Sequence, residues 1–234
     1  MRVLVVGGSG GIGAALVRCY LDHPQVVEVV ATWHDKPGDF SHSKLLWRRL
    51  DVTREDQIAA LADGVPVLGR LINCVGVLHG AGKGPEKTVK SLDPAFFLQA
   101  MTVNTLPTLL LAKYFGEALK REQSVFAALS ARVGSIGENN LGGWYSYRAS
   151  KAALNMALKT LSREWRVKVP RCCVAALHPG TTDTPLSQPF QGNVTPDRLF
   201  TPERTARQLL AIIEGLNPEL SGRFWSWDGA ELPW

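Results

Sequence analysis

The chain has 234 residues, of which 45% are hydrophobic, and its 26 basic and 21 acidic side chains give a formal net charge of +5. This length and composition provide for one sizeable core, so we expect residues 1–234 to form a single domain. The basic residues are scattered, which argues against a nucleic-acid partner, and polar residues interrupt even the apolar run Leu106–Phe115, which argues against a membrane-spanning helix.

The N-terminus and the cysteines indicate a cytoplasmic location. Met1–Val6 leads directly into a glycine-rich turn, without the basic segment, apolar stretch and cleavage site of a signal peptide. The cysteines have neither metal-ligand spacing nor the pattern of a secreted disulfide framework. They are Cys19, Cys74, Cys172 and Cys173. We therefore expect a cytoplasmic protein with reduced cysteines and no metal site.

Hydrophobic runs of strand length alternate with helical patterns along the chain, which predicts a parallel sheet with helices on both faces. The predicted strands are Arg2–Val6, Val26–Thr32, Leu45–Leu50, Arg70–Cys74, Ser124–Ser130, Cys172–Leu177 and Arg223–Trp227. The predicted helices lie near Ile12–Leu21, Glu55–Ala62, Pro94–Lys120, Tyr145–Trp165 and Pro202–Leu216. Two long connections, Gly76–Ser91 and Pro179–Phe200, interrupt this alternation, and loops of that length are usually functional.

A glycine-rich turn, Gly7–Gly13, lies between the first predicted strand and the first helix. Glycine permits positive φ and close backbone approach, so a pyrophosphate can rest on amide groups at the positive end of the helix dipole. The turn matches two dinucleotide-binding spacings, formed by Gly8, Gly10 and Gly13 or by Gly7, Gly11 and Gly13. Although such a turn can also be a simple tight connection, its position predicts a Rossmann-type α/β fold with a doubly wound, mainly parallel seven-stranded sheet.

The end of the second predicted strand bears on the choice of dinucleotide. Folds of this kind often place an acidic residue there, which holds the ribose hydroxyls of NAD. No acid closes this strand, whereas His34 and Lys36 follow it and can meet a 2′-phosphate. We therefore expect NADP as the cofactor, with NAD as the alternative if both are only solvated loop residues.

Tyr147 and Lys151 stand four residues apart near the start of a long predicted helix, so their side chains share one helix face. An ammonium group near a phenol favours the phenolate. We therefore expect Lys151 to lower the pKa of Tyr147 toward the range in which it can exchange a proton with a substrate oxygen. The pair alone proves little, because Tyr and Lys at this spacing occur on many surface helices.

Taken together, these landmarks resemble the short-chain dehydrogenase/reductase family. They follow the order of the family over nearly the whole chain and comprise the glycine turn, Asp51-Val52, Asn73–Gly76, Asn104, Tyr147–Lys151 and Pro179-Gly180. Within the family, the likeness is strongest to the C-factor-like and sniffer-like carbonyl reductases. It is carried by Arg132–Ile136, Gly142–Tyr147 and Gly222–Trp234.

The resemblance implies roles for the matching residues. Tyr147 would exchange the proton with the substrate. Lys151 would lower the pKa of Tyr147 and bind the nicotinamide ribose, and Asn104 would anchor a water that links Lys151 to solvent. Pro107 tends to kink the predicted helix, which fits this role of Asn104, although it could simply bend a packed helix. The implied cofactor contacts are Gly7, Ser9, Gly11, Ile12 and Gly13 at the phosphates, His34 at the 2′-phosphate, Asp51 and Val52 at the adenine, Asn73 and Gly76 near the ribose, and Pro179, Gly180, Thr182 and Thr184 near the nicotinamide.

One position departs from the family. The family usually ends the fifth strand with two serines, the second of which donates a hydrogen bond to the substrate oxygen, and here that second position is Ala131. Strand alternation directs Ser130 to the opposite side of the sheet, so we expect Ser135, beyond Gly134, to supply the hydroxyl. The alternatives are that the hydroxyl is dispensable or that activity is weak. We interpret His178 as a packed strand-end residue rather than a base.

These residues predict an NAD(P)-dependent oxidoreductase that transfers a hydride between nicotinamide and a small-molecule carbonyl or alcohol. The alternative is a non-catalytic NAD(P)-binding sensor or signalling protein, against which the intact Tyr147, Lys151 and Asn104 argue. We expect the substrate pocket to be built from loops around residues 76–91, 137–145 and 186–200. The family resemblance implies a homodimer or homotetramer packed through the Pro94–Lys120 and Tyr145–Trp165 helices.

Overall fold

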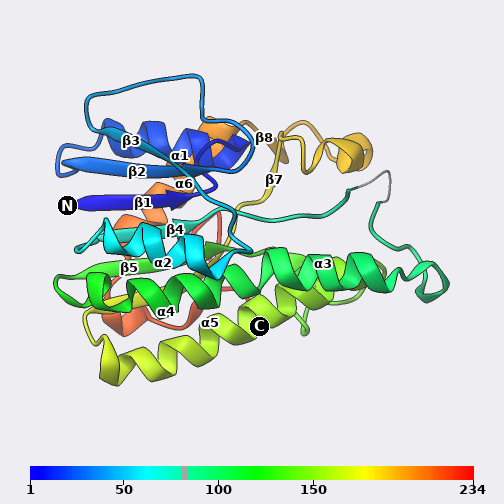
Figure 1. The fold of residues 1–234 in the computed structure, drawn as a ribbon. Coiled ribbons are helices and arrows are strands. Elements are labelled where there is room, and N and C mark those ends of the chain that lie inside the picture. Colours follow the sequence, from blue (N-terminus) through cyan, green and yellow to red (C-terminus); the bar gives the residue numbers. More distant parts are fainter. Residues whose placement is uncertain (81–83) are drawn as a thin grey trace.

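The computed structural model describes residues 1–80 and 84–234, and its centre is a sheet of seven strands (Figure 1). These are β1 (Arg2–Val6), β2 (Glu28–Trp33), β3 (Leu45–Arg49), β4 (Arg70–Asn73), β5 (Ser124–Leu129), β6 (Cys172–His178) and β9 (Arg223–Ser226). Their order is β3-β2-β1-β4-β5-β6-β9, and every neighbouring pair is parallel. The predicted seven-stranded, doubly wound fold is confirmed.

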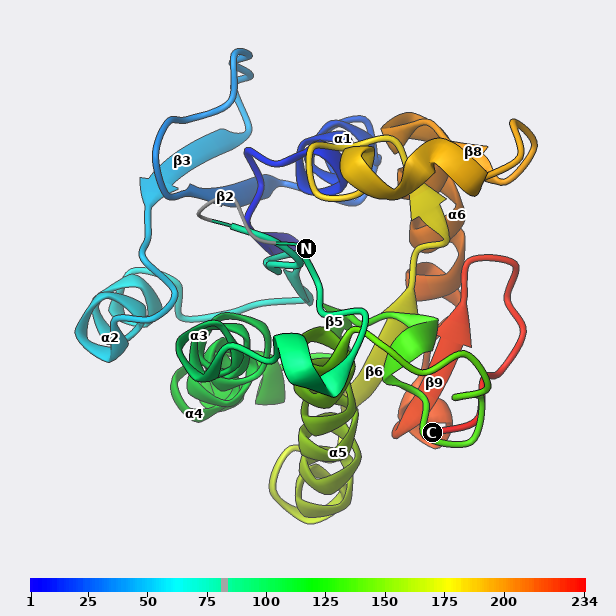
Figure 2. The same ribbon diagram turned by 90° about the vertical axis from the view of Figure 1, so that its right-hand side faces the viewer.

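Helices cover both faces of the sheet, as Figure 2 shows. One face carries α1 (Gly11–Leu21) and α6 (Pro202–Gly215), and the other carries α2 (Glu55–Asp63), α4 (Leu106–Lys120) and α5 (Tyr145–Lys168). Successive strand residues point to opposite faces, so each strand contributes to two cores. In β1, Val3 and Val5 pack toward α1 and α6, whereas Leu4 and Val6 pack toward α4 and α5.

From β1 the chain continues to β2 and β3 on one side of the sheet, and from β4 it continues to β5 and β6 on the other side. The connections that leave β1 and β4 therefore run in opposite directions. In α/β sheets, such a reversal opens a crevice at the carboxyl edge, where ligands bind. Figure 2 looks onto this edge. Of the predicted long loop Gly76–Ser91, residues 81–83 lie outside the described residues.

The segment Pro94–Lys120 is helical as predicted, with one break near Pro107. The segment forms two helices, α3 (Pro94–Asn104) and α4, separated at Thr105, whose φ and ψ are −115° and −57°. The physical reason is Pro107, which has no N–H for the carbonyl four residues back and whose ring crowds that turn. The hydroxyl of Thr105 donates to the carbonyl oxygen of Ser150 in α5 at 2.8 Å, which fixes the break against the neighbouring helix.

The connection after β6 is more ordered than the expected loop. It contains two short paired strands, β7 (Thr181–Thr182) and β8 (Leu199–Phe200), and a 3-10 helix at Gln188–Asn193. Further 3-10 helices occupy Val89–Ser91, Arg132–Gly134 and Pro218–Leu220. These elements are too short to leave a periodic pattern in the sequence.

By length and composition, the segment Pro94–Lys120 is the one described helical segment apolar enough to cross a membrane. A core helix of a soluble protein passes the same test, and 44% of its most apolar window is buried inside the fold. The segment is also divided at Thr105, as described above.

Candidate active site

Two cavities adjoin at the carboxyl edge of the sheet. The first, of about 280 Å³, is lined by the glycine turn, by Cys74–Gly76 after β4 and by Lys151 of α5. The second, of about 290 Å³, is lined by Ala131–Val133 after β5 and by residues of the loop after β6. Tyr147 and Ile12 line both cavities. The predicted catalytic tyrosine therefore stands where the two spaces meet.

The first cavity owes its shape to the glycine turn. Gly7 has a φ of +77°, in the left-handed region that favours glycine. A Cβ on Gly13 would overlap the carbonyl oxygen of Gly7, and a Cβ on Gly11 would overlap the side chain of Thr184. The helix α1 begins here with Gly10 as its N-cap, and no side chain caps its first amides. This open helix N-terminus fits the pyrophosphate of a dinucleotide.

Tyr147 and Lys151 are both buried on one face of α5, at 7% and 3% exposure. Nζ of Lys151 lies 5.8 Å from the centroid of the Tyr147 ring and donates to the carbonyl oxygen of Leu129 at 2.8 Å. Burial lowers the pKa of Lys151 to about 8 and raises the pKa of Tyr147 above its usual range. The direction is opposite to the lowering that we expected from Lys151, and its cause is burial of the phenol. A raised pKa favours the neutral phenol, which is the proton-donating form.

The helix that carries both residues begins at a strained residue. Trp144, the N-cap of α5, has a φ of +54°, which is uncommon for an aromatic residue. Its backbone N–H donates to the carbonyl oxygen of Glu86 at 2.5 Å, and the buried carboxylate of Glu86 accepts from the N–H and the hydroxyl of Ser146. A carboxylate is favourable at the positive end of a helix. Glu86 therefore fixes the start of α5, directly before Tyr147.

Asn104 ends α3 and holds the segment after β4. Its Oδ1 accepts from the N–H of Val77 at 2.7 Å, and its Nδ2 donates to the carbonyl oxygen of Val77 at 2.9 Å and to the hydroxyl of Ser150 at 2.8 Å. A Cβ on Gly76 would lie 3.4 Å from both Oδ1 of Asn104 and Nζ of Lys151, so these two side chains flank Gly76. Asn104 is therefore close to Lys151, and both hydrogens of the Asn104 side-chain amide are donated in hydrogen bonds.

Neither Ser130 nor Ser135 offers a free hydroxyl at the position where Ala131 lacks one. Ala131 lines the second cavity. The hydroxyl of Ser130 donates to Oδ1 of Asn155 at 2.6 Å. Ser135 is 2% exposed, its hydroxyl accepts from the N–H of Glu138 at 3.3 Å, and it does not line either cavity. The structure therefore does not bring Ser135 to the cavity that Tyr147 lines.

His178 is a polar residue of the second cavity that the sequence patterns did not single out as functional. It is the last residue of β6, and its Nδ1 accepts a hydrogen bond from the backbone N–H of Arg132 at 3.3 Å. Burial, and after it the charge of Arg132, lower the pKa of His178 to about 4. The ring is therefore neutral near pH 7, and because Nδ1 is the acceptor, the proton is on Nε2.

The residues expected at the adenine end occupy different environments. His34 follows β2 with a side chain that is 65% exposed, and its ring nitrogens lie 2.9 Å from the carboxylate of Asp35 and 4.0 Å from that of Asp51. The carboxylate of Asp51 accepts from the N–H and the hydroxyl of Thr53, which lowers its pKa. Val52 is buried in the core near α2. The Asp51 and Thr53 pair shapes the turn after β3.

Asn73 ends β4, Gly76 lies in the segment after it, and the two differ in role. Nδ2 of Asn73 donates to the hydroxyl of Thr108 at 2.9 Å, and its Oδ1 accepts from the N–H of Val75 at 3.1 Å. The buried amide of Asn73 therefore braces the turn, whereas Gly76 lines the first cavity. Ser9 is half-buried within the glycine turn.

The chain after β6 closes both cavities. Pro179 and Thr184 line both of them, and Gly180 has a φ of +73°. A Cβ on Gly180 would come within 2.6 Å of the ring of Phe200, so the glycine is required for this close approach. The hydroxyl of Thr182 shares a hydrogen bond with the hydroxyl of Thr205 at 2.8 Å, which ties the loop to α6.

Aromatic side chains wall the second cavity, and no sequence pattern revealed them. The ring of Trp144 lies 5.3 Å from that of Phe190 and 6.3 Å from that of Tyr147, centroid to centroid. His79 lies 5.8 Å from Phe190 in the same cluster. These residues come from the three loops that we expected around the substrate, and their meeting depends on the tertiary fold.

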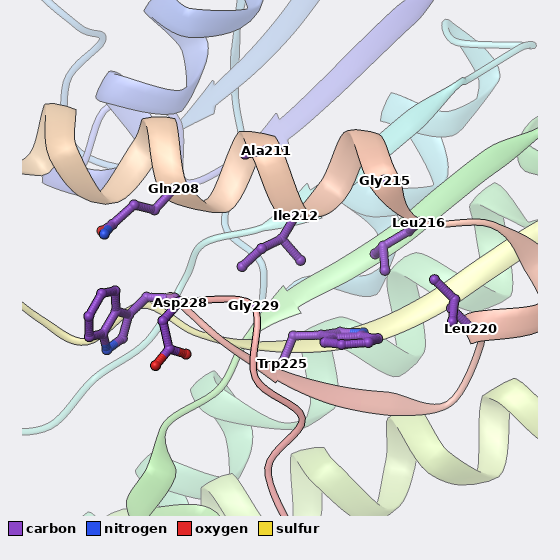
Figure 3. A pocket seen from close by; sticks show the side chains of 10 residues that line it. Gln208, Ala211, Ile212, Gly215, Leu216, Leu220, Trp225, Asp228 and Gly229 are labelled. Atoms are coloured by element: carbon purple, nitrogen blue, oxygen red, sulfur yellow. The ribbon is translucent and has the colours of Figure 1, made fainter.

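A third cavity, of about 540 Å³, lies between α6 and β9 (Figure 3). The side chains of Ile212 on α6 and Trp225 on β9 lie on opposite sides of the space, and Leu216 and Leu220 lie at one end of it. None of its lining residues belongs to the two cavities at Tyr147, so it is separate from the candidate active site. Within residues 1–80 and 84–234, no group of three His, Cys, Asp or Glu side chains is arranged to hold a metal ion.

The geometry of the glycine turn gives a test of its packing. Gly13→Ala should destabilise the fold by about 1–3 kcal/mol, because the new Cβ would meet the backbone carbonyl of Gly7. Gly10→Ala is the matched control, since its Cβ would find only the Gly7 carbonyl oxygen, at 3.5 Å. Urea unfolding measures both variants, and equal stability of Gly13→Ala and wild type would contradict the described turn.

Comparisons with known proteins agree with this geometry. The family model for short chain dehydrogenase matches residues 1–194. The 1-hydroxy-2-glutathionyl-2-methyl-3-butene dehydrogenase of Rhodococcus sp. (strain AD45) is 34% identical over 99% of both chains, and the C-signal of Myxococcus xanthus is 36% identical over 70% of this chain and 91% of its own. The NADPH-bound carbonyl reductase from chicken fatty liver is 27% identical, with a TM-score of 0.87 over 100% of this chain and 94% of its own. The family resemblance seen in the sequence is confirmed: the chain belongs to the short-chain dehydrogenase family and is an NAD(P)-dependent oxidoreductase.

Proposed function

We propose that the chain reduces a carbonyl compound with NADPH and that Tyr147 donates the proton. The observation that carries this proposal is that Tyr147 lines both the cavity framed by the glycine turn and the cavity walled by aromatic residues. A nicotinamide in the first and a carbonyl group in the second would both lie against the phenol. On this proposal, residues 1–234 act as a single dinucleotide-binding and catalytic domain.

The side chains supply the acid chemistry of the reaction. When bound, the dinucleotide would supply the hydride. Tyr147 gives its phenol proton to the carbonyl oxygen, and its raised pKa keeps that proton in place until the oxygen gains negative charge. The ammonium of Lys151 stabilises the phenolate that remains. In the reverse direction the phenolate accepts the proton of an alcohol, so the neutral phenol favours reduction near pH 7.

Further residues complete the proposed site. Lys151 binds the nicotinamide ribose, and Asn104 anchors a water through the remaining lone pair of Oδ1. Ser135 is left out of the proposed machinery, because its hydroxyl belongs to the turn that ends at Glu138. The cofactor contacts proposed from the family remain Gly7, Ser9, Gly11, Ile12, Gly13, His34, Asp51, Val52, Asn73, Gly76, Pro179, Gly180, Thr182 and Thr184.

The lining of the second cavity supports an apolar carbonyl substrate. Trp144 and Phe190 contribute aromatic rings to the lining, and Leu78, Leu186 and Val194 add aliphatic surface. Such walls gain free energy from burying an aryl or alkyl group, with polar contacts concentrated at the reacting oxygen. An aldehyde or ketone with one apolar substituent fits this chemistry best.

Basic side chains near the end of β2 support NADP over NAD. His34 and Lys36 follow this strand, and Arg48 and Arg49 of β3 line the same surface cavity as His34. A 2′-phosphate gains from such groups, whereas no acidic residue closes the strand to hold a ribose 2′-hydroxyl. The NADPH bound to the chicken carbonyl reductase is consistent with this choice.

We also propose that the chain forms a homodimer or homotetramer in the cytoplasm. The apolar side chains of Leu106 and Leu109 on α4 and of Met156 on α5 are 41%, 43% and 65% exposed. Covering such residues against a second copy removes apolar surface from water. The free state of the four cysteines suits a reducing compartment.

The first test concerns the proton donor. Tyr147→Phe should lower kcat at least about 100-fold, the usual effect of removing a general acid, while the Kd for NADPH stays within about twofold. Steady-state kinetics and fluorescence titration measure the two quantities. Tyr145→Phe, an exposed tyrosine at the start of the same helix, is the matched control. A Tyr147→Phe enzyme with more than about a tenth of wild-type kcat would remove Tyr147 from the mechanism.

The second test concerns cofactor choice. Wild type should show a kcat/KM at least about tenfold higher with NADPH than with NADH, the equivalent of about 1.4 kcal/mol. The double variant His34→Ala, Lys36→Ala should lower the ratio of kcat/KM with NADPH to kcat/KM with NADH. The control is His42→Ala, Lys44→Ala, the same residue types in the loop before β3. Equal use of both cofactors by wild type, or an unchanged ratio in the first double variant, would refute the assignment.

The third test concerns assembly. Leu109→Glu should convert the oligomer to a monomer in sedimentation velocity, because it places a charge in the proposed interface. Val27→Glu, at a hydrophobic residue 68% exposed before β2, is expected to leave the oligomer intact. Wild type that sediments as a monomer would rule out the proposed assembly.

A further inference from the structure

A second hydrogen-bond donor at the substrate oxygen would stabilise the charge that develops there in the proposed reduction. A carbonyl oxygen that gains negative charge offers more than one lone pair, and Tyr147 occupies one of them. Ala131 has no hydroxyl, the hydrogen of the Ser130 hydroxyl is engaged by Asn155, and Ser135 does not line the cavity. A second donor would therefore come from another residue around this space.

His178 lies next to the position that lacks the hydroxyl. In the parallel pairing of β5 and β6, Leu129 is the partner of Leu177, and the N–H of Ser130 donates to the carbonyl oxygen of Leu177 at 2.8 Å. His178 is the next residue on β6, so it lies beside the end of β5. It lines the second cavity together with Ala131 and Tyr147.

The hydrogen bond to Arg132 determines which ring nitrogen of His178 can donate. A backbone N–H can only donate, so Nδ1, which receives the bond from Arg132 at 3.3 Å, must carry a lone pair. A neutral ring then has its hydrogen on Nε2. Among the described residues, the hydrogen bond recorded for the ring is the one at Nδ1, and the charge of Asp228 also acts on the ring. His178 thus offers an uncommitted N–H donor among the cavity-lining residues.

We propose that His178 is a catalytic residue whose Nε2–H donates a hydrogen bond to the substrate oxygen, in place of the hydroxyl absent at Ala131. This assignment rests on the proposed carbonyl reduction. Tyr147 transfers the proton, and His178 stabilises the oxygen without transferring one. Burial keeps the His178 ring neutral above about pH 4, so its donor capacity is constant over the working pH range.

Two substitutions separate the donor from the structural role of the ring. His178→Asn places Oδ1 near the position of Nδ1 and retains an acceptor for Arg132, but it has no group at Nε2. His178→Gln places an N–H donor near Nε2 and loses that acceptor. We expect kcat to fall about 100- to 1000-fold in His178→Asn, with NADPH affinity and melting temperature near wild type, and to remain within about tenfold in His178→Gln. Activity of His178→Asn within threefold of wild type would overturn the proposal.

A rescue experiment tests the equivalence of the two donors. Adding Ala131→Ser to His178→Asn should raise kcat at least about tenfold above that of His178→Asn alone, because the serine hydroxyl supplies the missing hydrogen bond. If the double variant is no more active than His178→Asn, the proposal is overturned. The proposal is also overturned if Ser135→Ala loses activity while His178→Asn keeps full activity. The Tyr147→Phe variant separates the proposed carbonyl reduction from the proposed role of His178. If Tyr147→Phe is inactive and His178→Asn is active, only the role of His178 is refuted.

The wild-type protein provides a check that needs no substitution. Nitrogen-15 NMR of the labelled chain distinguishes the protonated from the unprotonated ring nitrogen of each histidine. At pH 7 we expect His178 to be neutral with its hydrogen on Nε2. A hydrogen on Nδ1, or a doubly protonated ring, would contradict the proposal even if His178→Asn does not fold.

Discussion

The active site depends on how closely the turn after β5 packs against α5. A Cβ on Gly134 would lie 2.7 Å from Cβ of Lys151, so only glycine allows the turn and the helix to approach this far. Nζ of Lys151 then reaches the carbonyl oxygen of Leu129, and Asn155, one turn further along α5, bonds both the hydroxyl of Ser130 and the carbonyl oxygen of Gly134. These contacts satisfy polar groups that would otherwise be buried without partners, and they hold Tyr147 at the edge of the sheet.

The other walls of the site depend on contacts between segments far apart in the sequence. Glu86, from the loop before α3, accepts hydrogen bonds at the N-terminus of α5 and keeps Trp144 in a left-handed conformation. Strain of this kind persists only where surrounding contacts compensate for it. Trp144 in turn packs on Phe190, from the loop after β6. The substrate side of Tyr147 is therefore shaped by two loops that contact each other through one strained residue.

Local patterns predicted the parts of this protein that local physics determines. The strands follow from hydrophobic runs, the phosphate cradle from the glycines of Gly7–Gly13, and the Tyr147 and Lys151 pair from helical spacing. The division of Pro94–Lys120 was only partly anticipated from Pro107, because the effect of a proline depends on what the neighbouring helix offers in compensation. The surroundings of Ser135 and the direction of the Tyr147 pKa shift do not follow from local patterns, since both depend on burial and on partners supplied by the folded chain.

The buried ammonium of Lys151 favours catalysis over simple cofactor binding. Its pKa is lowered from 10.5 to about 8, which corresponds to roughly 3 kcal/mol against the charged form in the folded chain. Because the folded pKa lies below the unfolded one, this cost is fully present below about pH 8 and disappears as the pH rises toward 10. Ribose binding alone would not require this cation to lie beside a buried phenol. Proton transfer does, because the phenolate formed when Tyr147 loses its proton is the state that the cation stabilises.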